Sequence, residues 1–167
     1  LASYNPETQT TARKQTGSFY TPREIVQYMV DESLISHLNR KVGSELESEY
    51  RKLTSYTDEE INLTKEQKVK IMHAIYQCKV LDPACGSGAF PVGLLQQMVH
   101  MLSKLDPTNE QWKEMLLDDA ERASRSAFQS DSKEEREERL KDIENAFDEN
   151  LNNPDYARKL FIIENCI

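Results

Sequence analysis

The sequence has few of the residues that cross-link a protein or bind a metal. Its 167 residues include three cysteines, with no Cys-x-x-Cys pair, and three histidines spread along the chain. Neither a disulfide framework nor a zinc or other metal site is indicated. No apolar run approaches the ~20 residues of a membrane span, and residues 1–15 are polar, with no signal-peptide core. We therefore expect a cytoplasmic protein that binds no membrane.

Positive charge is also scarce. The chain has 21 Lys and Arg against 29 Asp and Glu, a net charge of −8 and a pI near 5.0. The acidity lies mostly in residues 91–167, with 10 basic and 17 acidic residues, against 11 and 12 in residues 1–90. Because Lys and Arg supply most nonspecific affinity for nucleic acid, this stretch is not expected to be a main DNA-gripping or RNA-gripping surface. This charge distribution remains compatible with an enzyme that acts on nucleic acid and has its basic surfaces elsewhere.

What the chain does have is the length and apolar content of one domain. Hydrophobic residues make up 38% of it, and a domain of this size buries roughly two-thirds of its chain surface. Residues 1–16 are rich in Thr and Gln and are interpreted as a flexible N-terminal arm. The folded part is expected over 17–167.

A helix is predicted from Thr21 to Leu38. Thr21 suits the N-cap, Pro22 suits the first helical position, and Glu24 follows the cap by three residues as in a capping box. The residues expected on its apolar stripe are Ile25, Val26, Met29, Val30, Leu34 and Leu38.

Further helices are expected downstream. Thr64 opens a second capped helix that should end near Gln77. Pro91 restarts a helix that is apolar around so much of its circumference, as far as Leu105, that it should be the buried core helix.

The rest of the chain also has helical patterns. A helix around Trp112 is followed by a charged stretch over 132–147, and a last helix starts at Pro154. The charge run 134–139 is typical of a solvated helix face, with docking of a partner as the alternative.

Between two of these helices lies a short apolar segment that ends in a glycine loop. Lys79 to Asp82 has a β-branched residue at its centre and runs into Pro-Ala-Cys-Gly-Ser-Gly, which cannot continue a regular element. A strand over about 79–82 that feeds a tight loop is predicted.

The residue types of the loop indicate ligand binding. Gly86 and Gly88 let backbone amides approach a ligand, the following helix offers free N–H groups, and doubly wound sheets bind ligands at the carboxyl ends of strands. A dinucleotide loop needs a third glycine where Pro91 stands, and the Gly-Lys-Ser/Thr of a phosphate-binding loop is missing. An acid directly before the loop, Asp82, suits a ligand with an ammonium group better than a pyrophosphate. A strand-to-helix turn with no ligand is the alternative.

Two motifs of the chain resemble a known family. Asp82-Pro-Ala-Cys-Gly-Ser-Gly-Ala-Phe90 resembles motif I of the S-adenosylmethionine-dependent N6-adenine DNA methyltransferases, and Gly17-Ser-Phe-Tyr-Thr-Pro22 resembles the motif X that precedes motif I in some of them. The order of the two motifs and their residues are most similar to those in the modification enzymes of type I and type IIG restriction-modification systems and their phage-defence relatives. Residues 153–165 also resemble the helix ahead of motif II in the type IIG group.

The resemblance implies a Rossmann-like α/β fold for the complete enzyme and S-adenosylmethionine as its cofactor. The backbone of Ala84, Gly86 and Gly88 would wrap the methionine part, and Asp82 would orient the loop and favour the ammonium group. Thr21 would close over the same moiety and its carboxylate. The implied cofactor-binding residues are Phe19, Tyr20, Thr21, Asp82, Pro83, Ala84, Cys85, Gly86, Ser87, Gly88 and Phe90.

Two further parts of the family pattern are not found here. The acid that holds the ribose follows the loop by about 20 residues. Asp106 stands near that distance, but it lies between a helix and Pro107 and is interpreted as a turn residue. That acid and the catalytic Asn or Asp with Pro-Pro and an aromatic are expected beyond Ile167. Asn153-Pro-Asp-Tyr156 differs from the catalytic pattern at one position, but a polar stretch precedes it, so Asn153 is interpreted as an N-cap.

The chain is thus interpreted as the N-terminal part of a DNA adenine methyltransferase, mainly helical around the first parallel strand. It should hold no catalytic residue and be inactive alone. The complete enzyme would flip adenine out of the duplex and methylate its N6. DNA would bind through parts outside this chain, with a specificity or nuclease domain or subunit as a candidate partner.

Two other functions stay open. One is a different S-adenosylmethionine-dependent methyltransferase acting on RNA, protein or a small molecule, and the other is a noncatalytic helical docking module. At single residues, Phe19 and Tyr20 could be core aromatics. Cys85 could be a nucleophile, but without a nearby His a small buried thiol under the loop is expected.

Overall fold

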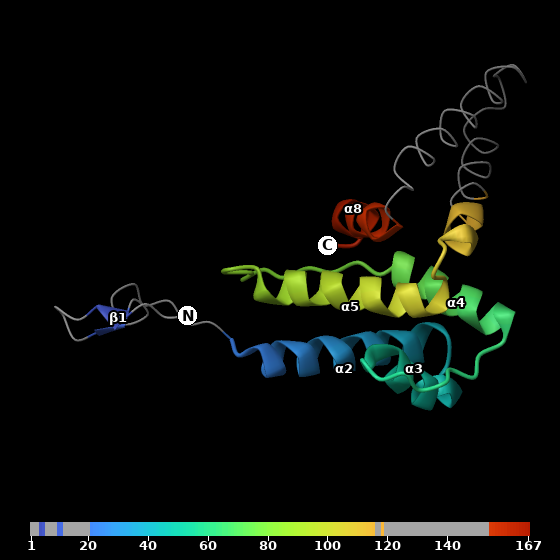
Figure 1. Ribbon diagram of the computed structural model, residues 1–167, viewed down its shortest axis with the longest axis horizontal. Coiled ribbons are helices and arrows are strands. Elements are labelled where there is room, and N and C mark those ends of the chain that lie inside the picture. Colours follow the sequence, from blue (N-terminus) through green and yellow to red (C-terminus); the bar gives the residue numbers. More distant parts are fainter. Residues whose placement is uncertain (1–3, 6–9, 12–20, 116–117, 119–153) are drawn as a thin grey trace, which may run out of the picture.

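The computed structural model of the chain describes residues 4–5, 10–11, 21–115, 118 and 154–167, and this part is mostly helical (Figure 1). The mainly helical fold expected for the chain is confirmed for these residues. The elements are β1 (Tyr4–Asn5), β2 (Thr10–Thr11), α2 (Arg23–Lys41), the 3-10 helix η1 (Ser44–Leu46), α3 (Glu47–Thr54), α4 (Lys65–Tyr76), α5 (Ala89–Leu105) and α8 (Pro154–Asn165). Residues 110–115 are also helical.

Helix α5 is the centre of the packing. It lies alongside α2 (Figure 1) and also contacts α3, α4 and α8. This agrees with its prediction as the core helix, although it begins two residues before Pro91. The buried apolar residues of α5 are Leu94, Met98, Val99, Met101, Leu102 and Leu105.

Helices α2 and α5 pack closely at Gly93. A Cβ at this position would lie 2.8 Å from Cγ1 of Val26, well inside the ~3.5 Å at which carbon atoms attract. Val26 is 6% exposed. Glycine is therefore what lets the first turns of the two helices lie against each other.

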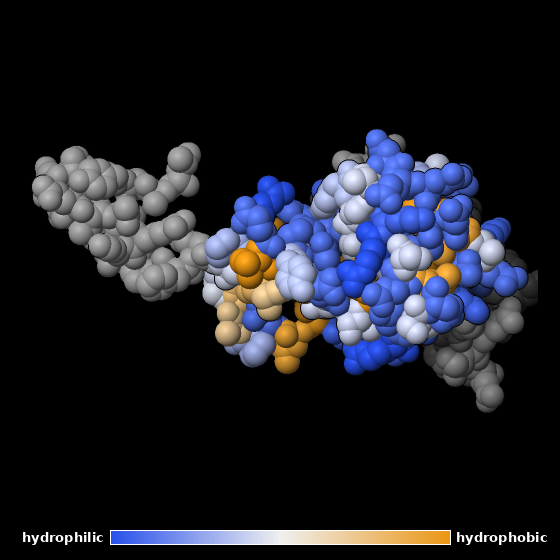
Figure 2. All heavy atoms as spheres, turned by 90° about the horizontal axis from the view of Figure 1, so that it is seen from below, coloured by the Kyte–Doolittle hydropathy of each residue, from blue (hydrophilic) through white to orange (hydrophobic). Residues whose placement is uncertain are grey.

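The apolar stripe of α2 differs in part from the prediction. Val26 and Val30 are buried, as are Leu34 and Leu38, but Ile25 and Met29 are each 49% exposed. Helix α5 packs on the row of residues that starts at Val26 and repeats every four residues. The neighbouring row, which contains Ile25 and Met29, therefore faces outward. Apolar surface is accordingly visible in Figure 2 at the end of the molecule where α2 begins.

The helix ends test the capping predictions. At α4 the capping box is confirmed, because Gln67 N donates to Thr64 Oγ1 at 3.2 Å and Thr64 N donates to Gln67 Oε1 at 2.8 Å. At α2 the predicted box is not formed. Pro22 is the N-cap residue, and its carbonyl accepts the first helical bonds from Ile25 N and Val26 N at 3.1 Å. The helix thus starts one residue later than predicted.

The strand predicted at about 79–82 is not formed. Among the described residues no other strand lies beside this segment, and strands exist only as pairs. Within the described part of the chain, its one backbone–backbone hydrogen bond is from Val80 N to Cys166 O at 2.7 Å, just after α8 ends. The segment still has a strand-like alternation, since Cys78, Val80 and Asp82 are buried or half-buried while Lys79 and Leu81 are exposed.

Two further expectations concern the N-terminal arm and the charged stretch. In the expected N-terminal arm, β1 and β2 form a two-residue antiparallel pair, with Tyr4 opposite Thr11. The charged stretch 132–147 lies outside the described residues. Of the helices that the structure describes, none has the length and apolarity needed to cross a membrane.

Candidate functional site

The glycine loop connects the extended segment to the start of α5 and is held by its own polar groups. Asp82 Oδ1 accepts a hydrogen bond from Ala84 N at 3.0 Å. Gly88 N donates to Cys85 O at 2.7 Å and closes the next turn. The carboxylate of Asp82 therefore holds the backbone of the loop at Ala84.

Both glycines of the loop have left-handed backbone conformations. Gly86 has φ +52° and Gly88, the N-cap residue of α5, has φ +80°, a region that residues with a side chain rarely adopt. A Cβ at Gly86 would meet nothing closer than 3.8 Å, and one at Gly88 nothing closer than 3.9 Å. Both distances are ordinary van der Waals contacts, and Gly86 is exposed, so a ligand could approach the backbone of the loop there.

The first turn of α5 adds free donors beside the loop. Gly88 provides no side-chain cap, and in the described part of the chain the N–H groups of Ala89 and Phe90 have no acceptor. Such N–H groups, together with the helix dipole, attract anionic or polar ligand atoms.

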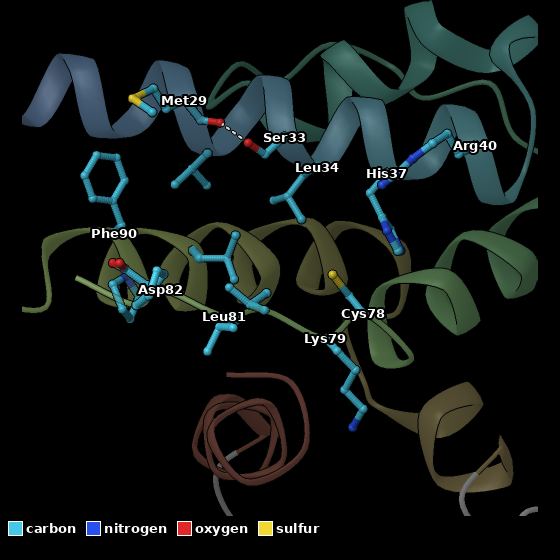
Figure 3. Close-up of a pocket in the computed structure, with 15 residues that line it drawn as sticks. Met29, Ser33, Leu34, His37, Arg40, Cys78, Lys79, Leu81, Asp82 and Phe90 are labelled. Atoms are coloured by element: carbon cyan, nitrogen blue, oxygen red, sulfur yellow. Dashed lines mark hydrogen bonds between the residues drawn. The ribbon is translucent and has the colours of Figure 1, made fainter. Parts of the chain in front are cut away.

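Two cavities adjoin the loop on different sides. We call the first the α2–loop groove. It has a volume of about 520 Å³ and lies between α2 and residues 78–83 (Figure 3). The second, which we call the interhelix cavity, has a volume of about 440 Å³ and lies between the first turns of α2 and α5. Both volumes are in the range of small-molecule sites.

The predicted site residues divide between these cavities. Asp82, Pro83 and Phe90 line the α2–loop groove, and Figure 3 shows Phe90 directed toward Met29 of α2. Thr21, Ser87 and Gly88 line the interhelix cavity. Ala84, Cys85 and Gly86 are exposed on the loop and line neither cavity. Phe19 and Tyr20 lie outside the described residues.

The interhelix cavity joins parts of the sequence that are far apart. Thr21, from the motif X-like segment, lines the same cavity as Ser87 and Gly88 from the motif I-like loop. The close contact at Gly93 brings these two segments together. Spacing in the sequence could not have revealed this, because it depends on how two helices pack.

The prediction from the sequence did not include four polar residues of this region. Arg23, Gln27 and Gln96 line the interhelix cavity, and Gln97 lies fully buried behind it. The available signal was the pair Gln96-Gln97, which interrupts an otherwise apolar helix. A polar residue on a buried helix face needs partners, and these partners were not visible in the sequence.

The three cysteines differ in burial. Cys85 is exposed, so the expectation of a buried thiol under the loop is wrong: the turn closed by Gly88 N and Cys85 O lies in a run of exposed residues, 83–87, and not against the described core. Cys78 and Cys166 are buried, and burial raises the pKa of both thiols. A raised pKa keeps a thiol protonated and unreactive.

Two interpretations outside the loop can be compared with the structure. Asp106 is the C-cap residue of α5 and is 3% exposed, and its Oδ2 accepts from Trp112 N at 3.0 Å, as fits a turn residue. Helix α8 begins at Pro154, which fits proline in the first helical position, whereas Asn153 lies outside the described residues. No cluster of potential metal ligands occurs among the residues described.

Comparison with known proteins gives no match among family models, curated proteins or solved structures.

Proposed function

We propose that this chain is the N-terminal part of an S-adenosylmethionine-dependent methyltransferase that acts on adenine N6 in DNA, and that it contributes part of the cofactor site. The observation that carries the proposal is the shared lining of the interhelix cavity by Thr21 and by Ser87 and Gly88. These are the two segments whose sequences resemble motifs X and I.

The residues present fit the methionine end of this cofactor. The exposure of Gly86, which has no side chain, lets the backbone of the loop come close to a ligand. The free N–H groups at the start of α5 suit a carboxylate, and the carboxylate of Asp82 at the loop suits an ammonium group. When bound, S-adenosylmethionine supplies a methyl group on a positively charged sulfur, and the chain's own residues hold and orient it.

The extended segment supports a Rossmann-like arrangement for the complete enzyme. Its alternating burial is that of a strand with one covered face, and the side chain of Leu81 on the other face is 86% exposed. In the described residues, the N–H groups of Lys79 and Leu81 have no acceptor. Neighbouring strands supplied by the rest of the enzyme would pair with these groups and cover Leu81.

The test is a calorimetric titration of S-adenosylmethionine into this chain and into a longer chain that includes the following strands. We expect micromolar binding or better by the longer chain and weaker binding by this one. The double substitution Gly86→Val, Gly88→Val should abolish both, while Gly43→Val, at a left-handed glycine far from the loop, should leave binding intact in the folded fraction. If both chains are folded and neither binds S-adenosylmethionine, the proposal is overturned and a helical docking module is favoured.

Activity separates the parts of the proposal. This chain alone should not methylate DNA, whereas the longer chain, if it includes the catalytic motif, should produce N6-methyladenine. Methylation of RNA, protein or a small molecule, but not of DNA, would retain the cofactor and replace the substrate.

A further inference from the structure

The extended segment 79–82 has one occupied and one open backbone edge. Val80 N donates to Cys166 O at 2.7 Å. Successive peptide groups of an extended chain point to opposite edges, so those of Lys79 and Leu81 point away from Cys166. Among the described residues, neither the N–H nor the C=O group of Lys79 or Leu81 makes a hydrogen bond. We call this side of the segment the open edge.

The open edge borders the α2–loop groove. Figure 3 shows the side chains of Lys79 and Leu81 directed away from α2, yet both residues line the groove. It is therefore their backbone that borders it. Most of the other lining residues are apolar, and they include Met29, Val30, Leu34, Phe90 and Leu94. A ligand in the groove thus meets free peptide groups on one side and apolar side chains on the other.

The two ends of the groove carry opposite charges. Figure 3 shows Asp82 at one end and Arg40 at the other. Burial raises the pKa of the Cys78 thiol and the positive charge of Arg40 opposes this effect, which agrees with a position of Arg40 near Cys78. The side chain of Arg40 is exposed and makes no hydrogen bond or ion pair with any described residue. Its guanidinium group is therefore available to an acidic group of a ligand.

The other basic side chains near this end already have partners. Lys79 Nζ donates to the carbonyl of Asn165, at the end of α8. His37 Nε2 donates to the carbonyl of Ala74 at 2.9 Å. Within the described part of the chain, Arg40 is thus the basic lining residue whose charge is not engaged.

These features together select an extended polypeptide. Only an extended chain offers N–H and C=O groups that can pair with the open edge at the ~4.8 Å spacing of neighbouring strands, because those of a helix are bonded within the helix. In a strand, every second side chain points to the same face. One such row would contact the apolar side chains of the groove, and an acidic member of that row would reach Arg40.

We propose that the α2–loop groove binds one extended segment of the complete enzyme, from outside this chain, that runs parallel to the open edge and begins with an acidic residue on Arg40. The resemblance implies neighbouring strands, but it does not specify this charge contact. That the occupant belongs to the same enzyme, and that it runs parallel, rests on the proposed function. The selection of an extended segment with an acidic residue rests on the groove alone.

The test uses two short peptides as probes. The Glu peptide is acetyl-Glu-Thr-Val-Thr-Val-amide, in which Glu and both Val share one face of a strand. The Lys peptide has Lys in place of Glu. Binding to this chain is followed by amide ¹⁵N–¹H NMR, which detects millimolar affinity. The amide signals of Lys79 and Leu81 should shift with the Glu peptide, whereas that of Val80, whose N–H already has an acceptor, should shift less.

A charge exchange tests the role of Arg40. The wild-type chain should bind the Glu peptide about threefold or more tightly than the Lys peptide, the scale of an exposed ion pair, and Arg40→Glu should reverse this preference. Lys41→Glu is the matched control, because it makes the same charge change at an exposed neighbour that does not line the groove. It should keep the wild-type preference. Equal effects of the two substitutions would show that only the net charge matters, and the proposal would be wrong.

A second probe tests pairing with the open edge. The Glu peptide with a methyl group on every backbone nitrogen keeps its side chains but cannot donate hydrogen bonds to the carbonyls of Lys79 and Leu81. We expect it not to bind. Binding as tight as that of the unmethylated peptide would contradict strand pairing in the groove.

The longer chain separates this proposal from the proposed function. Its own segment should fill the groove, so the Glu peptide should bind this chain and not the longer one. If the longer chain binds both S-adenosylmethionine and the Glu peptide, the occupant is wrong and the proposed function stands. If this chain binds the Glu peptide with the stated preference but neither chain binds S-adenosylmethionine, the proposed function is wrong and the charge-selective groove stands. Sedimentation should show a monomer, and a dimer abolished by Arg40→Glu would assign the groove to a second copy instead.

Discussion

At the residue scale, Gly93 sets the distance between the two helices that form the interhelix cavity. Alanine is a better helix former than glycine by about 1 kcal/mol, so on propensity alone Gly93→Ala should stabilise α5. The added methyl would meet Cγ1 of buried Val26 at 2.8 Å, however, and a β-branched side chain on a packed helix cannot move away cheaply. We expect the clash to outweigh the gain in helix propensity, so that the free energy of unfolding, measured in urea, is lower in the variant by about 1–3 kcal/mol.

A double-mutant cycle identifies the cause of this loss. Val26→Ala removes the methyl that the new Cβ would meet, so Gly93→Ala should cost less in that background. Gln96→Ala, an exposed neighbour on the same helix, should be close to neutral. Equal costs of Gly93→Ala in both backgrounds would mean that the helices do not meet at this point.

Glu49 gives the fold a pH dependence that one substitution removes. It is 9% exposed, and its carboxylate accepts from Lys52 Nζ and from the backbone N of Asn62, both at 2.8 Å. These two bonds, that of Lys52 first, hold the pKa of Glu49 below its ordinary value. A lowered pKa in the folded state stabilises the protein above the ordinary carboxyl pKa near 4.3, and that contribution is lost as the pH falls through the folded value.

Glu49→Gln should therefore reduce stability at pH 7 and have less effect with decreasing pH. The difference in unfolding free energy between wild type and variant, measured in urea from pH 7 to pH 3, should shrink on the acid side. Glu66→Gln, an exposed acid in the first turn of α4, serves as the control. A difference that stayed constant with pH would show that the bonds of Glu49 do not depend on its charge.

At the element scale, one lysine of α5 caps the end of α3. Lys104 Nζ donates to the carbonyls of Lys52 at 2.9 Å, Ser55 at 2.6 Å and Thr57 at 3.1 Å. The last carbonyls of a helix have no partner inside it, and a cation there also meets the negative end of the helix dipole. Lys104→Met should cost about 1.5–3 kcal/mol, the value of hydrogen bonds to a charged group.

Urea unfolding monitored by circular dichroism measures this cost. Lys70→Met, on the exposed side of α4 and without such bonds among the described residues, should change stability by less than about 0.5 kcal/mol. Similar losses for both substitutions would assign the effect to the general loss of positive charge in an acidic protein, and not to capping.

The elements also show where sequence reasoning succeeds. The cap at Thr64 and Gln67 was predictable because both partners lie within one helical turn. The exposure of Ile25 and Met29 was not, because it depends on which row of α2 meets α5. Gln97 could be recognised as unusual in an apolar helix, but its partner Thr54 lies 43 residues earlier in the sequence. The prediction of a strand at 79–82 was wrong for a related reason, since a strand needs a neighbouring strand and the described residues do not supply one.

At the scale of the whole molecule, an aromatic cluster connects parts of the chain on both sides of residues 119–153. Tyr76 of α4 stacks on Trp112 with ring centroids 5.6 Å apart, and Phe161 of α8 meets both rings edge-on at 5.2 and 5.7 Å. Buried Arg158 of α8 donates to the carbonyl of Asp106 close by. Through these contacts α8 belongs to the same core as α4 and α5, although it begins 49 residues after the end of α5.

The single tryptophan of the sequence makes this association measurable. Trp112 is 2% exposed. If α8 and the helices before it form one cooperative unit, Trp emission and the circular dichroism signal should change at the same urea concentration. Phe161→Ala should shift both transitions together by about 2–3 kcal/mol, less than for a fully buried phenylalanine because this ring is half-buried. Ile163→Ala, at a side chain 52% exposed on the same helix, should shift them little. An emission change that precedes the loss of helix would mean that α8 detaches on its own and that the core consists of α2 to α5 alone.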